Sequence, residues 1–138
     1  MSHLLRATTL ALFSFCAFIA NAKNDITQPV QPVIETKQGA VRGGTEKGVL
    51  VWKGIRFAEA ERFKAPQAPR AWTGVKDALE FGPVAPQTKS GLSTDGPQSE
   101  DCLSLNIWSP AADGKKRPVM FWIHGGGFVI GAGSSDLY

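Results

Sequence analysis

Short runs typical of β-strands, interrupted by glycine and proline, recur along much of the chain. Three of them near the start are separated by glycine-containing breaks and predict a small antiparallel meander. They span residues 33–36, 40–42 and 49–53. At 103–109 apolar and polar residues alternate, which predicts a strand with one apolar face. No segment has a convincing helical period, so the pattern indicates a β-rich body.

One stretch is apolar without alternation. Residues 119–123, Val-Met-Phe-Trp-Ile, are too short for a helix and are typical of a strand buried on both faces. Asp113-Gly114 is a turn signal between this run and 103–109. We therefore expect 103–109 and 118–123 to form an antiparallel pair.

The first 22 residues have the features of a secretory signal peptide. A short basic start precedes an apolar run at 7–20, which is too short to span a bilayer comfortably. Residues 20–22, Ala-Asn-Ala, have the small-x-small pattern of a cleavage site. We expect cleavage after Ala22 and a secreted or periplasmic protein, with an uncleaved membrane anchor as the alternative.

Composition excludes several classes of function. The chain carries 15 Lys and Arg against 12 Asp and Glu, and its one basic cluster, 115–117, more simply solvates a turn than binds nucleic acid. Cys102 and His124 are the one cysteine and the one histidine in residues 23–138, so we expect neither a disulfide within that stretch nor a His/Cys metal site. Dinucleotide and P-loop glycine patterns are absent from the sequence, and we expect no cofactor.

The apolar run leads into His124-Gly125-Gly126-Gly127-Phe128. Three successive glycines free the backbone to turn sharply and to bring N–H groups against a guest that side chains would crowd out. After a buried strand, a plausible guest is a negatively charged oxygen, as in the HGGG-type oxyanion hole of lipases and esterases. The alternative is that the glycines only make a tight turn.

Two blocks of residues carry a family resemblance. Glu-Asp-Cys-Leu-Ser-Leu-Asn-Ile-Trp at 100–108 and Trp-Ile-His-Gly-Gly-Gly-Phe at 122–128 resemble the N-terminal part of the type-B carboxylesterases, the carboxylesterase, lipase and cholinesterase family. Upstream blocks agree, among them Lys-Gly-Ile-Arg-Phe-Ala at 53–58. The resemblance implies the α/β class and the α/β-hydrolase fold. Residues 23–138 would be its N-terminal β-rich portion, with a small antiparallel meander, a long loop and the first strands of the main sheet.

The resemblance also implies roles for the loop. Gly126 and Gly127 would donate their backbone N–H groups to the oxyanion, while His124, Gly125 and Phe128 would shape the loop. His124 is less suited to be the catalytic base, because the triad histidine of this fold follows the nucleophile along the chain. The implied partner is a small-molecule ester, with neither nucleic acid nor, after signal cleavage, a membrane.

The family's nucleophile lies in a G-x-S-x-G motif. The nearest matches, at 91–95 and 133–137, each lack the second glycine. We therefore expect residues 23–138 to be a portion of a secreted serine esterase that is truncated before the nucleophile, the acid and the histidine base, and to be inactive alone. One alternative is a fragment of a non-catalytic, cholinesterase-like binding protein. Another is a stand-alone β protein that binds through its proline-rich loop.

A long proline- and glycine-punctuated stretch, residues 58–99, predicts an irregular loop with at most one helical turn near 76–80. The resemblance implies an ion pair between Arg62 and Glu100 across it, with a nitrogen–oxygen distance of about 2.7–3.2 Å. Ala85 stands where many members of the family have a partner for Cys102. We therefore expect Cys102 to be a free, buried thiol.

Overall fold

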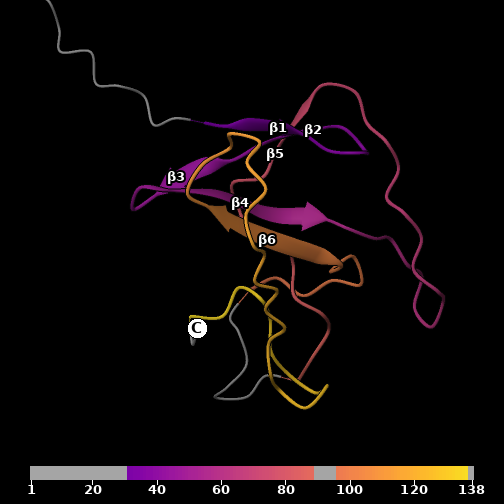
Figure 1. Cartoon of the computed structure of the whole chain (residues 1–138). Coiled ribbons are helices and arrows are strands. Elements are labelled where there is room, and N and C mark those ends of the chain that lie inside the picture. The colour runs from indigo at the N-terminus through magenta and orange to yellow at the C-terminus, as the bar shows by residue number, and fades with distance from the viewer. Residues whose placement is uncertain (1–30, 89–95, 137–138) are drawn as a thin grey trace, which may run out of the picture.

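The computed structural model describes residues 31–88 and 96–136, so the expected signal peptide lies outside the described residues. Within those ranges the chain forms strands joined by loops, with no helix (Figure 1). The strands are β1 (Val33–Glu35), β2 (Ala40–Arg42), β3 (Gly44–Glu46), β4 (Val49–Arg56), β5 (Val75–Asp77) and β6 (Ser104–Ser109). They form two three-stranded sheets, in the orders β1-β2-β5 and β3-β4-β6.

The first sheet combines a hairpin with a strand from far along the chain. β1 and β2 pair antiparallel across a turn in which the Thr36 hydroxyl accepts from the Gly39 N–H and donates to the Gly39 carbonyl. β5 pairs parallel with β2. No helical turn forms near 76–80, which is within the expected limit of one turn. Pairing with β2 satisfies the backbone of 75–77 in an extended conformation instead.

The second sheet is built around β4, the longest strand. β3 and β6 pair antiparallel with its two edges, and the register shifts between Trp52 and Ile55. Gly54 lies in this β-bulge with a φ of 66°, and a Cβ there would come within 2.6 Å of the Glu80 carbonyl. The bulge thus lets the long loop pack against the sheet.

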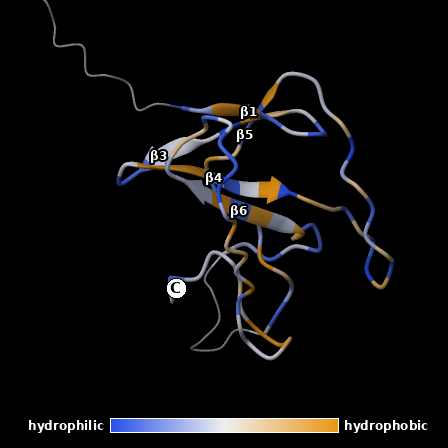
Figure 2. Ribbon diagram, in the orientation of Figure 1, coloured by the Kyte–Doolittle hydropathy of each residue, from blue (hydrophilic) through white to orange (hydrophobic). Residues whose placement is uncertain are grey.

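A small core joins the two sheets. Val41 of β2, Trp52 of β4 and Ala78, just after β5, are 3%, 2% and 5% exposed and form one cluster. Figure 2 shows apolar residues recurring along β4 and β6. The strands expected at 33–36, 40–42, 49–53 and 103–109 form, but they belong to two sheets rather than to one continuous meander. The break lies at Gly43, where the chain passes so close to Trp52 that a Cβ would lie 2.7 Å from the indole nitrogen.

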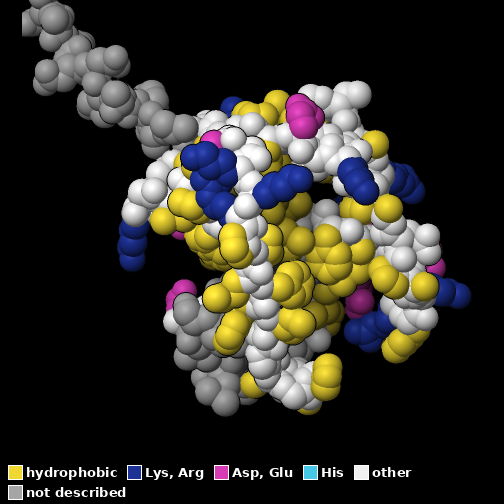
Figure 3. All heavy atoms as spheres, viewed as in Figure 1, with side chains coloured by type: hydrophobic (Ala, Val, Ile, Leu, Met, Phe, Trp, Pro, Cys, Tyr) yellow, Lys and Arg dark blue, Asp and Glu magenta, His cyan; other side chains and the backbone are white. Residues whose placement is uncertain are grey.

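The expected strand at 118–123 does not form, and the antiparallel pair with 103–109 is wrong. β6 pairs with β4 instead, and the side chains of 119–123 are 64% to 91% exposed. A run that is apolar on both faces needs neighbours on both sides to become a central strand, and no strand of the described ranges pairs with it. Hydrophobic side chains accordingly gather at the surface (Figure 3).

The turn at Asp113-Gly114 does form, although no paired strands flank it. Gly114 takes a φ of 71°, and both carboxylate oxygens of Asp113 accept from the Arg117 guanidinium, at 2.6 and 2.8 Å. This bidentate bond holds the pKa of Asp113 well below its usual range. Arg117, the last residue of the basic cluster 115–117, thus closes the turn.

Candidate functional site

The glycine loop folds into a compact turn. The carbonyl of Gly126 accepts from the N–H groups of Val129, at 3.0 Å, and Ile130, at 3.2 Å. Gly126, Gly127 and Phe128 have φ angles of 118°, 62° and 63°. Such angles are favourable for glycine and strained for a residue with a side chain. The two glycines therefore favour this turn.

At two of the glycines, other backbone atoms approach so closely that a side chain has no room. A Cβ on Gly126 would lie 1.8 Å from the Ile130 carbonyl oxygen. On Gly131, whose φ is 112°, it would lie 2.6 Å from the Gly125 carbonyl oxygen. A Cβ on Gly125 or Gly127 would meet nothing within 4 Å. The three consecutive glycines therefore differ, since only Gly126 faces a backbone atom at clashing distance.

The turn leaves two backbone donors free. In residues 31–88 and 96–136, no acceptor is recorded for the N–H of Gly126 or of Gly127, and both residues are exposed. The turn is held through the Gly126 carbonyl, so these N–H groups are positioned without being used. An oxygen anion is the kind of guest that such preorganised donors can bind.

The other expected loop residues lie around this turn. His124 donates its Nδ1–H to the Gly125 carbonyl at 2.8 Å, and its ring lies against Gly131. The Phe128 side chain is fully exposed. These contacts bring His124 and Gly125 together, and their loop-shaping role, like that of Phe128, stays a prediction.

Two side-chain amides that the sequence reasoning missed hold the loop on the rest of the fold. Gln87 accepts from the Gly131 N–H at 2.8 Å and donates Nε2 to the Gly131 carbonyl at 3.0 Å. Asn106 of β6 accepts from the Gly54 N–H at 2.9 Å and donates Nδ2 to the Gly133 carbonyl at 3.3 Å. The available signal for Asn106 was its place on the polar face of the predicted strand 103–109, but sequence alone names no partner for it.

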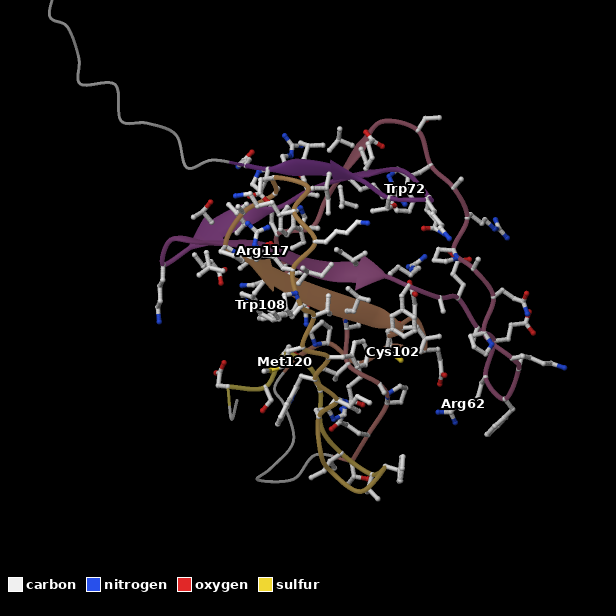
Figure 4. All side chains as sticks on the ribbon, viewed as in Figure 1. Arg62, Trp72, Cys102, Trp108, Arg117 and Met120 are labelled. Atoms are coloured by element: carbon white, nitrogen blue, oxygen red, sulfur yellow. The ribbon has the colours of Figure 1, made fainter. Side chains whose placement is uncertain are left out.

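The structure also brings Arg62 and Glu100 together. Arg62 Nε lies 2.9 Å from Glu100 Oε1, within the expected distance. The two side chains are 58% and 57% exposed, so the pair is a surface ion pair. Figure 4 shows Arg62 on the long loop, well away from the sheets.

Cys102 is a free thiol just before β6, and it is half-buried rather than buried as expected (Figure 4). Burial raises the pKa of this thiol, and the neighbouring carboxylates of Glu100 and Asp101 raise it further. Both effects disfavour the thiolate, which is the reactive form.

We therefore expect Cys102 to react slowly with iodoacetamide. At neutral pH, alkylation of Cys102 in a folded protein that contains this chain should be slower than in the same protein unfolded in urea, because the thiolate fraction is smaller in the folded state. The difference should narrow as the pH rises above the native pKa. Mass spectrometry of the peptide containing Cys102 measures both rates, and equal rates at neutral pH would contradict the raised pKa.

The described ranges lack two further features, a metal-binding cluster and a membrane-spanning helix. They contain no cluster of three or more His, Cys, Asp or Glu residues that could hold a metal ion. Nor do these ranges contain a helix of the length and apolar character that a membrane span requires.

Comparison with known proteins finds esterases and related hydrolases that are similar to this chain in sequence. Over 114 residues the chain is 47% identical to the para-nitrobenzyl esterase of Bacillus subtilis, covering 77% of this chain and 23% of that protein. It is 40% identical over 119 residues to the phenmedipham hydrolase of Pseudarthrobacter oxydans, covering 78% and 24%. The chain thus spans about a quarter of the length of these relatives.

Solved structures show the same relationship. A carboxylesterase of Geobacillus stearothermophilus matches with a TM-score of 0.66 and 55% identity, over 75% of this chain and 21% of that one. An esterase of Clostridium hathewayi matches with a TM-score of 0.69 and 46% identity, over 75% and 23%. The described part therefore has the fold of a segment of an α/β-hydrolase. The sequence pattern of the Carboxylesterase family matches residues 30–138, and the chain belongs to that family.

Proposed function

We propose that this chain supplies the oxyanion-hole loop of a secreted carboxylic-ester hydrolase. The observation that carries the proposal is the pair of N–H groups at Gly126 and Gly127, which have no acceptor within residues 31–88 and 96–136 and are held on a turn by other atoms of the loop. Membership of the carboxylesterase family supports the reaction class. The signal-like residues 1–22 support secretion.

The chemistry follows from what such donors can do. A serine oxygen attacks the ester carbonyl, and the carbonyl oxygen becomes an anion in the tetrahedral intermediate. The N–H groups of Gly126 and Gly127 stabilise this charge, each contributing roughly 10²–10³ in rate. The intermediate collapses by expelling the alcohol, and water then hydrolyses the acyl-enzyme. In this proposal the serine, its histidine base and the acid come from outside residues 23–138.

The proposed substrate is a small carboxylic ester. The loop offers neutral donors rather than charged side chains, which suits an uncharged ester carbonyl that develops charge only during the reaction. Relatives named para-nitrobenzyl esterase and phenmedipham hydrolase support a small organic substrate.

A fusion enzyme tests the proposal. In it, the matching stretch of this chain, 77% of its length, replaces the aligned stretch of the Bacillus subtilis para-nitrobenzyl esterase, 23% of that protein. We expect the fusion to hydrolyse para-nitrobenzyl and short-chain para-nitrophenyl esters, and to be inhibited by a serine-directed phosphonate. Residues 23–138 alone should show no hydrolysis above that of buffer. A fusion that folds, as judged by its circular dichroism and thermal transition, but does not hydrolyse either ester would overturn the proposed function.

The same fusion enzyme measures the ion pair. Because Arg62 and Glu100 are both more than half exposed, Arg62→Ala and Glu100→Ala should each change the free energy of unfolding by roughly 0–1 kcal/mol. The double variant should show a coupling of the same small size, which disappears at about 1 M salt. Urea denaturation provides the measurement. A coupling of several kcal/mol that persists in salt would mean that the pair is buried in the folded enzyme.

A further inference from the structure

The exit of the glycine loop is held by one side chain at two points. The Gln87 carboxamide contacts both the N–H and the carbonyl of Gly131, at 2.8 and 3.0 Å, and so pairs with that residue much as a neighbouring strand would. Nε2 of Gln87 also donates to the Ala85 carbonyl at 3.1 Å. The amide orientation is therefore fixed by three backbone partners.

The backbone of Gln87 is itself held by Gln98, which lies on another segment of the long loop. Its backbone N–H donates to Gln98 Oε1, and its carbonyl accepts from Gln98 Nε2, both at 3.0 Å. Close by, Val84 donates to Pro97 and accepts from Ser99 through the backbone. The Gln87 side chain thus projects from an anchored position.

The contact between Gln87 and Gly131 is linked to the Gly126 and Gly127 N–H groups through a few neighbouring residues. Gly131 packs against the Gly125 carbonyl and the His124 ring, so closely that a Cβ would clash with both. The residue before it, Ile130, donates to the Gly126 carbonyl, and the residue after it, Ala132, is 7% exposed. A displacement of Gly131 would therefore move the turn that carries the Gly126 and Gly127 N–H groups.

We propose that Gln87 is a positioning residue for the oxyanion donors, a role that rests on the proposed function. A glutamine suits this task because its amide donates and accepts at once. Glutamate at this position accepts from the Gly131 N–H but, when ionised, cannot donate to the Gly131 carbonyl. Alanine does neither.

Kinetics of the fusion enzyme test the proposal. Gln87→Ala should lower kcat about 10- to 100-fold with KM unchanged, since a displaced donor weakens the transition state more than the bound ester. Gln87→Glu should give a kcat between those of the wild type and Gln87→Ala. The matched control is Gln67→Ala, which removes an exposed amide whose recorded contact is a 3.4 Å bond to the Ala65 carbonyl, and it should leave kcat unchanged.

Hydrogen exchange of the same proteins supplies an independent readout. In Gln87→Ala, exchange of the Gly131 amide should accelerate about tenfold, as expected for loss of one hydrogen bond, and Val129 and Ile130 should accelerate with it. Acceleration confined to Gly131, or an unchanged kcat in an active fusion, would overturn the positioning role while leaving the proposed function standing. A fusion with wild-type Gln87 that folds but is inactive would instead overturn the proposed function, and the positioning role with it.

Discussion

Replacing Gly126 by alanine in the fusion enzyme should lower kcat about 10²–10³-fold, the effect of losing an oxyanion donor. The added Cβ would lie 1.8 Å from the Ile130 carbonyl oxygen, and the φ of 118° is one that alanine rarely adopts. The turn must therefore open, and the N–H groups of Gly126 and Gly127 lose their common orientation. Steady-state kinetics on a para-nitrophenyl ester measures the loss.

Gly125→Ala is the matched control, because the neighbouring glycine has no positive φ and open space where its Cβ would stand. Its kcat should fall much less than that of Gly126→Ala, because the added Cβ does not force the turn to open. Gly127→Ala should lie between the two, since its φ of 62° is strained for alanine but its Cβ meets nothing. Equal losses for Gly125→Ala and Gly126→Ala would show that the geometry described for the turn does not govern catalysis.

Residues 23–138 on their own should self-associate and lack a sharp thermal transition. Val119, Met120, Phe121, Trp122 and Ile123 are 64% to 91% exposed, and such a run of apolar side chains favours association. Among residues 31–88 and 96–136, few residues are buried, and of these Trp52 is the only large one. Light scattering after size-exclusion chromatography and a thermal melt measure the two properties.

Two substitutions test whether the apolar run 119–123, rather than any exposed aromatic residue, causes the self-association. Phe121→Lys should reduce association, because it places a charge in the middle of the apolar run. Phe63→Lys changes an aromatic residue that is 96% exposed on the long loop, outside that run, and should have little effect. A monomeric wild-type chain with a cooperative two-state melt would refute the expectation.

Local patterns could predict only part of this fold. The alternation at 103–109 was enough to predict β6, because the residues on one face of the predicted strand are mostly apolar and those on the other are mostly polar. β5 has three exposed residues, Val-Lys-Asp, and its parallel pairing with β2 depends on contacts about 35 residues away. The apolar run 119–123 was misassigned because apolar content predicts burial only where other elements are available to cover it.

The same limit applies to the candidate site. The three glycines and the preceding histidine could be found from the sequence, since such a run has few uses. Their differences could not, because they depend on where the Ile130 and Gly125 carbonyls lie. Gln87 and Asn106 were missed for a related reason. A single polar amide carries no pattern, and its partner, 44 or 27 residues away, is known only once the chain is folded.

The amide contacts of the glycine loop impose an order on folding. The turn from Gly126 to Ile130 closes within a few residues and can form early. Asn106 contacts Gly54, 52 positions away in the sequence, and Gln87 contacts Gly131, 44 positions away. Both contacts can form only after long stretches of chain have been brought together. Pairing of β4 with β6 brings Asn106 and Gly54 close. The final orientation of the Gly126 and Gly127 donors is therefore a late event, reached only by molecules whose sheets are already assembled.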